Sequence, residues 1–164
     1  MTPLRQRLQH LLNWLHLIET AIAGLSLLLL AALVFGQIIA RNFFDTGIPG
    51  ADILSRHLLL YILFFGAALA TDAARHIRID LLTVWMPEHL LARLYRPLLA
   101  VGILIMLLLA HAAWRFWQDS WAYCQPHECW TVAMDLVIPA GFCLLALHFL
   151  LDFLLAEPPA RRLP

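Results

Sequence analysis

Four long apolar stretches, separated by short polar segments, dominate the pattern of hydrophobic positions along this chain. They cover about residues 20–40, 53–74, 98–117 and 132–155. A helix of about 20 apolar residues is long enough to cross the hydrocarbon core of a bilayer. The pattern therefore predicts an all-α membrane protein with four transmembrane helices.

Two further segments combine a helical spacing of apolar residues with frequent charges. Residues 3–19 and 76–96 contain apolar runs that are too short to cross a membrane. We expect each segment to form an amphipathic helix that lies at the membrane surface. Three prolines should mark element boundaries. Pro87 should divide the second segment, Pro97 should lie in the first turn of the third span, and Pro139 should kink the fourth.

Composition supports the same class of protein. Of the 164 residues, 62% are hydrophobic and 13% are charged, and the mean hydropathy is +0.78. We therefore treat residues 1–164 as a single membrane domain. The net charge is zero and lysine is absent, so the chain offers no basic tract for a nucleic acid.

The distribution of arginine predicts the orientation of the spans. Arginines are concentrated at the two ends of the chain and in the connection between spans two and three, at positions 5, 7, 75, 78, 93, 96, 161 and 162. The other two connections hold only Arg41, Arg56 and Arg115. By the positive-inside rule, both termini and the 76–96 segment should be cytoplasmic.

The centres of the first three spans are apolar, as in Ala31–Ala32, Phe64–Gly66 and Met106–Leu108. A protein that carries a polar solute by itself needs ionisable groups or broken helices at this depth. Transport by this chain alone is therefore disfavoured. The sequence also contains no phosphate-binding loop, nucleophile elbow or paired catalytic carboxylates, so we expect no enzymatic activity and assign no catalytic residue.

Small residues recur every fourth position in the second span, at Gly66, Ala70 and Ala74. They predict a face where another helix, in this chain or in a partner, packs closely. Oppositely charged residues at helical spacing lie mostly near the span ends: Asp52 with Arg56, Asp72 with Arg75 and His76, Arg115 with Asp119, and His148 with Asp152. Such a pair contributes only about 0.2–0.5 kcal/mol in water. These residues are either interfacial anchors and packing contacts or contacts to a partner subunit.

Histidines within the spans raise the possibility of a haem site. His57 and His111 lie at similar predicted depth and could ligate haem b within a four-helix membrane anchor of an electron-transfer complex. We keep this as the alternative and assign no cofactor. His148 lies deeper without an evident mate, so a hydrogen bond to a neighbouring helix is the simpler expectation.

Cys124 and Cys129 flank four residues in the turn before the last span, which is predicted to be periplasmic. An oxidising compartment favours a disulfide between them. A metal site that includes His127 and Glu128, or two free thiols, are the alternatives, although the spacing is not that of a zinc finger. Cys143, within the last span, is expected to be a small packing residue.

Residues 60–80 resemble the small membrane subunit of tripartite ATP-independent periplasmic (TRAP) transporters, the DctQ-like family. The family pattern is Phe-x-Gly-Ala followed by His-Ile-x-Ile-Asp, and it is matched by Phe64, Gly66, Ala67, His76, Ile77, Ile79 and Asp80. Residues 37–44 and 138–147 are similar to the ends of its first and last spans. One departure concerns the residues before span two, where the family usually has tryptophan and two acidic residues and this chain has only Asp52.

The resemblance implies a non-enzymatic subunit in the bacterial inner membrane that holds a larger, DctM-like membrane subunit. That partner would carry the ion-driven, elevator-type transport path, and a periplasmic substrate-binding protein would deliver the solute. The usual solutes are organic acids, and sodium is the usual coupling ion. Candidate partner-interface residues are Asp52, Arg56, Gly66, Ala70, Ala74, His76 and Asp80.

Overall fold

The computed structural model describes the backbone of residues 3–85 and 88–155, and the side chains of residues 12–71, 94 and 96–154. Within these ranges the secondary structure consists of helices joined by turns and short irregular segments, with no strand. The five helices are α1 (Pro3–Phe44), α2 (Ala51–Trp85), α3 (Glu88–Ala122), α4 (Cys129–Met134) and α5 (Val137–Leu155).

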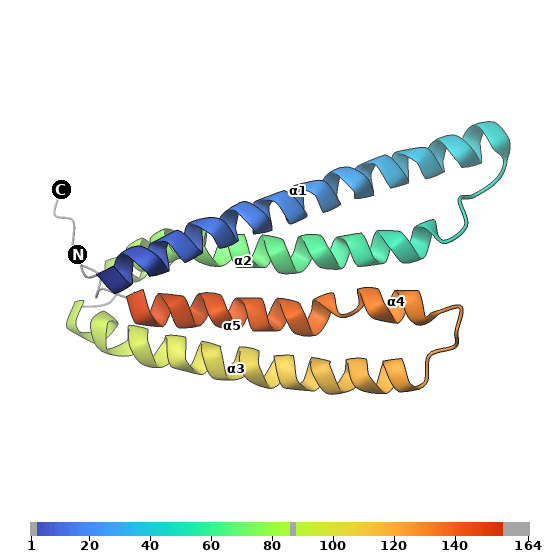
Figure 1. Ribbon diagram of the computed structural model, residues 1–164. Coiled ribbons are helices and arrows are strands. Elements are labelled where there is room, and N and C mark those ends of the chain that lie inside the picture. Colours follow the sequence, from blue (N-terminus) through green and yellow to red (C-terminus); the bar gives the residue numbers. More distant parts are fainter. Residues whose placement is uncertain (1–2, 86–87, 156–164) are drawn as a thin grey trace.

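The long helices lie roughly side by side in the order α1, α2, α5 and α3, and α4 extends the line of α5 (Figure 1). Accordingly, α1 packs mainly on α2, α2 also packs on α5, and α5 packs on α3. The C-terminal half of α1 diverges from α2 (Figure 1). The start of α1 and the end of α5 lie at the same end of the molecule, as four crossings of a membrane require.

Four helical segments are long and apolar enough to cross a membrane, which confirms the predicted fold class. They are Leu12–Phe44, Ala51–Thr71, Arg96–Ala122 and Cys129–Leu154. The segments expected at the membrane surface are not separate helices. Residues 3–19 form the start of α1, residues 76–85 form the end of α2, and residues 88–96 form the start of α3. With 42 residues, α1 is about 63 Å long and exceeds the bilayer core of about 30 Å. The interfacial position of these extensions stays a prediction.

Two of the proline predictions need correction. Pro97 lies inside α3, because that helix already begins at Glu88. The fourth span is broken rather than kinked, with α4 ending at Met134 and α5 beginning at Val137. Pro139 explains the position of the break, because it has no N–H to donate to the carbonyl of Asp135, four residues earlier. The Asp135 carbonyl instead accepts from the Ile138 N–H at 2.9 Å.

The turn between α1 and α2 requires two residues in the left-handed region. Asp45 follows the end of α1 with φ 48°, and Gly50 precedes α2 with φ 78°. Glycine adopts this conformation without the steric cost of a Cβ atom, and aspartate tolerates it better than most residues. The predicted turn is therefore present, and it reverses the chain between the first two spans.

The packed core lies between α2 and α5. Its buried members are Phe64, Ala68, Val137 and Leu145. The Phe64 ring meets Phe142 edge to face, with centroids 5.1 Å apart. Most other long apolar side chains on α1 and α3 are exposed on the isolated chain, as expected for surfaces that meet lipid or another membrane subunit.

Candidate functional site

One face of α2 carries all four predicted interface residues whose side chains the structure describes. Its members are spaced alternately by four and three positions, the repeat of a helix–helix seam. We call it the α2 seam, and it consists of Asp52, Arg56, Leu59, Leu63, Gly66 and Ala70. Leu59 and Leu63 are 57% and 59% exposed, whereas Ala68, on the face toward α5, is fully buried.

Within the part of the chain whose side chains are described, no other helix fills the α2 seam at Gly66. A Cβ atom added at Gly66 would meet nothing within 4 Å. Toward the start of α2, an open, apolar hollow of about 470 Å³ is lined by Arg56, Leu59 and Leu63. No described residue packs closely on Gly66, so the expectation that another helix packs on this face stays a prediction.

The remaining predicted interface residues are Ala74, His76 and Asp80. Their side chains lie outside the described residues, as do those of Asp72 and Arg75. The His-Ile-x-Ile-Asp half of the motif is therefore placed on α2 by its backbone only.

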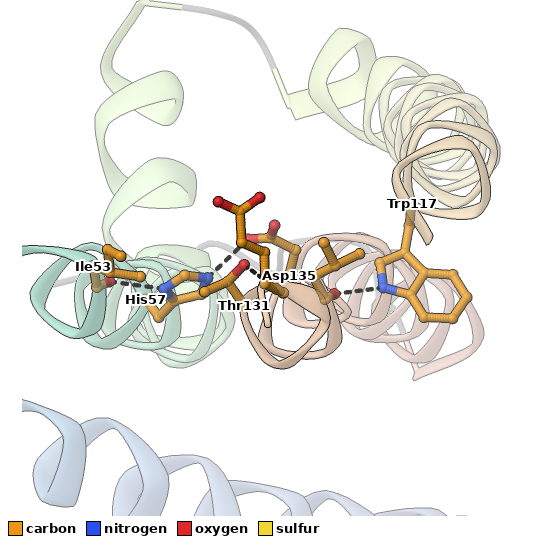
Figure 2. Close-up of polar contacts among 7 residues, drawn as sticks. Ile53, His57, Trp117, Thr131 and Asp135 are labelled. Carbon is orange, nitrogen blue, oxygen red and sulfur yellow. Dashed lines mark hydrogen bonds and ion pairs between the residues drawn. The ribbon is translucent and has the colours of Figure 1, made fainter. Parts of the chain in front are cut away.

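A polar contact joins α2 to the break between α4 and α5. His57 is buried, and its Nδ1 lies 2.8 Å from the Ile53 carbonyl oxygen (Figure 2). A carbonyl oxygen can only accept, so Nδ1 carries a proton. The other ring nitrogen, Nε2, forms an ion-pair contact of 3.1 Å with Asp135 Oδ1.

This contact bears on the haem alternative. The Nε2 atom of His57 lies against the carboxylate of Asp135. The other suggested ligand, His111, is an exposed residue of α3. The structure does not favour a bis-histidine haem site at these two residues.

Aromatic and sulfur contacts fix the turn between α3 and α4. The Trp117 indole N–H donates to the Val132 carbonyl at 2.8 Å (Figure 2). Cys124 and Cys129 form a disulfide with Cα atoms 5.4 Å apart, so the structure gives the pairing that sequence reasoning had left among three alternatives. Cys143 is an exposed free thiol, which corrects its expected role as a packing residue.

A second polar cluster lies between α1 and α5, near the end opposite to His57. Glu19 and His148 are 1% and 2% exposed, and His148 Nε2 lies 3.3 Å from Glu19 Oε1. The ring of His16 stacks on that of His148 with centroids 6.1 Å apart, and Asp152 is also buried. We refer to His16, Glu19 and His148 as the α1–α5 cluster.

Sequence reasoning missed this cluster because it left His148 without a mate. It treated residues 3–19 as a helix separate from the first span, whereas α1 runs through both and buries Glu19 against α5. A signal was present, because His16 and Glu19 are three residues apart and share one helical face just before the apolar run.

Comparison with known proteins connects these features to a family. The family described as "Tripartite ATP-independent periplasmic transporters, DctQ component" matches residues 30–157. A curated relative from Haemophilus influenzae, named "Putative TRAP transporter small permease protein", is 30% identical over 86 residues, or 52% of this chain and 49% of the relative. The aligned region thus spans about half the length of that relative. No solved structure matches the chain.

The family match extends from the middle of α1 to the end of α5, and it includes the whole α2 seam and both residues of the His57–Asp135 contact. It covers most of the chain and agrees with the four membrane-spanning helices. The chain therefore belongs to the DctQ family, the small membrane subunits of TRAP transporters.

Proposed function

We propose that this subunit is the static scaffold of its transporter and that the α2 seam binds the large, DctM-like membrane subunit. The observation that carries the proposal is the open space over Gly66. Close approach of two helices in lipid requires small residues, and Gly66 and Ala70 provide them on a face that the described residues leave open at Gly66.

The rest of the seam suits a protein partner in the membrane. Leu59 and Leu63 offer apolar side chains beside the hollow, into which side chains of a facing helix would insert. Asp52 and Arg56 are exposed at the end of the seam, near the start of α2, where charges can contact a partner or headgroups. The single carboxylate of Asp52 would then serve where the family usually has two.

The internal packing supports a holding role rather than a solute path. The polar contacts His57–Asp135 and Glu19–His148 lie toward opposite ends of the spans. Between them, α2 and α5 meet through the apolar side chains of Phe64, Ala68 and Leu145. Such a core offers no groups to replace the hydration of a polar solute.

In this proposal the partner carries the ion-coupled, elevator-type path, and a periplasmic binding protein delivers the solute. Organic acids are the proposed solutes and sodium the proposed coupling ion. The small subunit would keep one side of the partner fixed in the membrane while the partner's transport domain moves.

The test is co-purification of the two membrane subunits with a Gly66→Leu variant. Leucine favours helix more than glycine does, and the site is open within this chain, so the subunit itself should fold normally. We expect the amount of large subunit recovered with the tagged small subunit to fall at least tenfold.

Gly24→Leu is the matched control, because a Cβ at Gly24 on α1 also meets nothing within 4 Å. It should leave recovery of the partner unchanged. Wild-type recovery of the partner by Gly66→Leu would refute the assignment of the seam. Solute uptake by the small subunit alone in proteoliposomes would refute the scaffold role.

A further inference from the structure

The α1–α5 cluster contains three metal-ligand side chains from two helices. One ligand atom from each of His16, Glu19 and His148 can be chosen so that all three lie within 4.8 Å of one another. Glu19 and His148 are almost completely buried, and His16 is partly buried. The proposed scaffold role of the subunit does not account for these three residues.

The tautomer of His148 leaves a ligand lone pair directed into the cluster. Its Nδ1 lies 3.0 Å from the Leu144 carbonyl oxygen, which can only accept, so Nδ1 carries the hydrogen. In the neutral ring, Nε2 then has the lone pair. Metal-binding histidines commonly donate their second ring N–H to a backbone carbonyl in this way, which fixes the ring for coordination.

The distance between His148 Nε2 and Glu19 Oε1 matches that between two ligand atoms of one metal ion. These two atoms are 3.3 Å apart, and the Nε2 atom of His148 makes no hydrogen bond to a described residue. Two ligands of a tetrahedral zinc ion with bonds of 2.0–2.1 Å are about 3.3–3.4 Å apart, and the metal lies to one side of the line between them. The observed separation is therefore that of neighbouring ligands.

We propose that His16, Glu19 and His148 bind a zinc-class transition-metal ion that clamps α1 to α5. Two imidazoles and one carboxylate suit Zn²⁺ and its neighbours, whereas Mg²⁺ and Ca²⁺ prefer sites made of oxygen ligands. A fourth ligand would come from water or from Asp152, which is buried one turn further along α5 on the side of His148.

The test measures zinc binding by the tag-free, full-length chain in detergent. After treatment with a chelator, the protein is incubated with Zn²⁺, passed through a desalting column and assayed by elemental mass spectrometry. We expect about one zinc ion per chain. In a titration, His148→Ala and Glu19→Gln should raise the Kd for Zn²⁺ at least tenfold.

His111→Ala is the matched control, because His111 is an exposed histidine outside the cluster. It should bind zinc like the wild type. Substituting Co²⁺ gives a second readout, since visible absorption bands of a tetrahedral ion should appear in the wild type and in His111→Ala but weaken in Glu19→Gln.

His16→Ala provides a second route if a variant of a fully buried residue fails to fold. Zn²⁺ should raise the thermal midpoint of the wild type, and this rise should be lost in His16→Ala. The proposal is overturned if the wild type keeps less than a tenth of an ion per chain, or if the cluster variants bind Zn²⁺ as tightly as His111→Ala does. In either case the contact between Glu19 and His148 does not hold a metal ion.

Discussion

The aromatic ring of Phe64 on α2 occupies the space into which a side chain at Gly141 on α5 would project. A Cβ atom at position 141 would overlap ring atoms and the Cβ of Phe64. Phe64 is buried and also meets Phe142 edge to face. The absence of a side chain at Gly141 thus sets how closely α2 and α5 approach in the only extended core among the described residues.

We expect Gly141→Ala to destabilise the subunit. Overpacking a core typically costs about 1–3 kcal/mol, and replacing glycine by alanine in a helix returns at most about 1 kcal/mol. The thermal midpoint in detergent, followed by tryptophan fluorescence, should therefore fall. Gly24→Ala gains the same helix propensity at an open site and should leave the midpoint unchanged or slightly higher. A thermal midpoint of Gly141→Ala equal to or above that of the wild type would show that the ring of Phe64 can move aside without loss of stability.

The contact between His57 and Asp135 should appear as a coupling energy in a double-mutant cycle. Removing both side chains should cost less than the sum of the two single alanine variants, by about 1 kcal/mol, because the Asp135 side chain is 33% exposed and water screens the pair. The measurement is reversible unfolding in mixed detergent micelles.

The exposed pair His127–Glu128 is the control cycle. Its atoms are 3.7 Å apart, and its side chains are 73% and 63% exposed. Its coupling should be close to zero. Equal coupling in the two cycles would mean that the His57–Asp135 contact does not join α2 to the helix break.

The disulfide predicts a definite count of reactive thiols. The chain has three cysteines, and only Cys143 is free. Protein purified without reductant and unfolded in denaturant should take up one alkyl group by mass spectrometry, and three after reduction. Recovery of three groups without reductant would contradict the bond between Cys124 and Cys129.

The same bond should stabilise the fold modestly. Closing a loop across a sequence separation of five residues restricts the unfolded chain by about 2 kcal/mol in the chain-entropy account. Cys124→Ser should therefore lower the thermal midpoint in detergent, whereas Cys143→Ser should not. Equal midpoints for Cys124→Ser and the wild type would mean that the bond contributes nothing to stability.

The four spans were predictable because crossing a bilayer imposes a length and a composition that each apolar stretch satisfies. The break in the fourth span was partly predictable, since Pro139 removes one donor. Whether the helix bends or breaks there depends on the contacts made by the neighbouring residues. Here the side chain of Asp135 also contacts His57 of α2. That partner cannot be read from the sequence of α5 alone.

The α1–α5 cluster was not predictable in the same way. A surface helix and a membrane helix both place apolar residues at intervals of three and four, so the pattern of residues 3–19 fits either. The choice between them decides whether Glu19 meets water or His148. The interface at Gly66 and Ala70 stays a prediction, because small residues at helical spacing indicate a close-packing face but not what occupies it.

The orientation of the subunit can be tested at both ends of the spans. The α1–α2 turn and the α3–α4 turn lie at the same end of the molecule (Figure 1), and the arginine distribution predicts that this end is periplasmic. In a variant with all three native cysteines replaced by serine, Thr46→Cys and His127→Cys should react with a membrane-impermeant maleimide in intact spheroplasts. Leu94→Cys, just before the third span, should react only after the membrane is permeabilised. The reverse result would place the disulfide in the reducing cytoplasm and overturn the orientation, because arginine would then be concentrated on the translocated side.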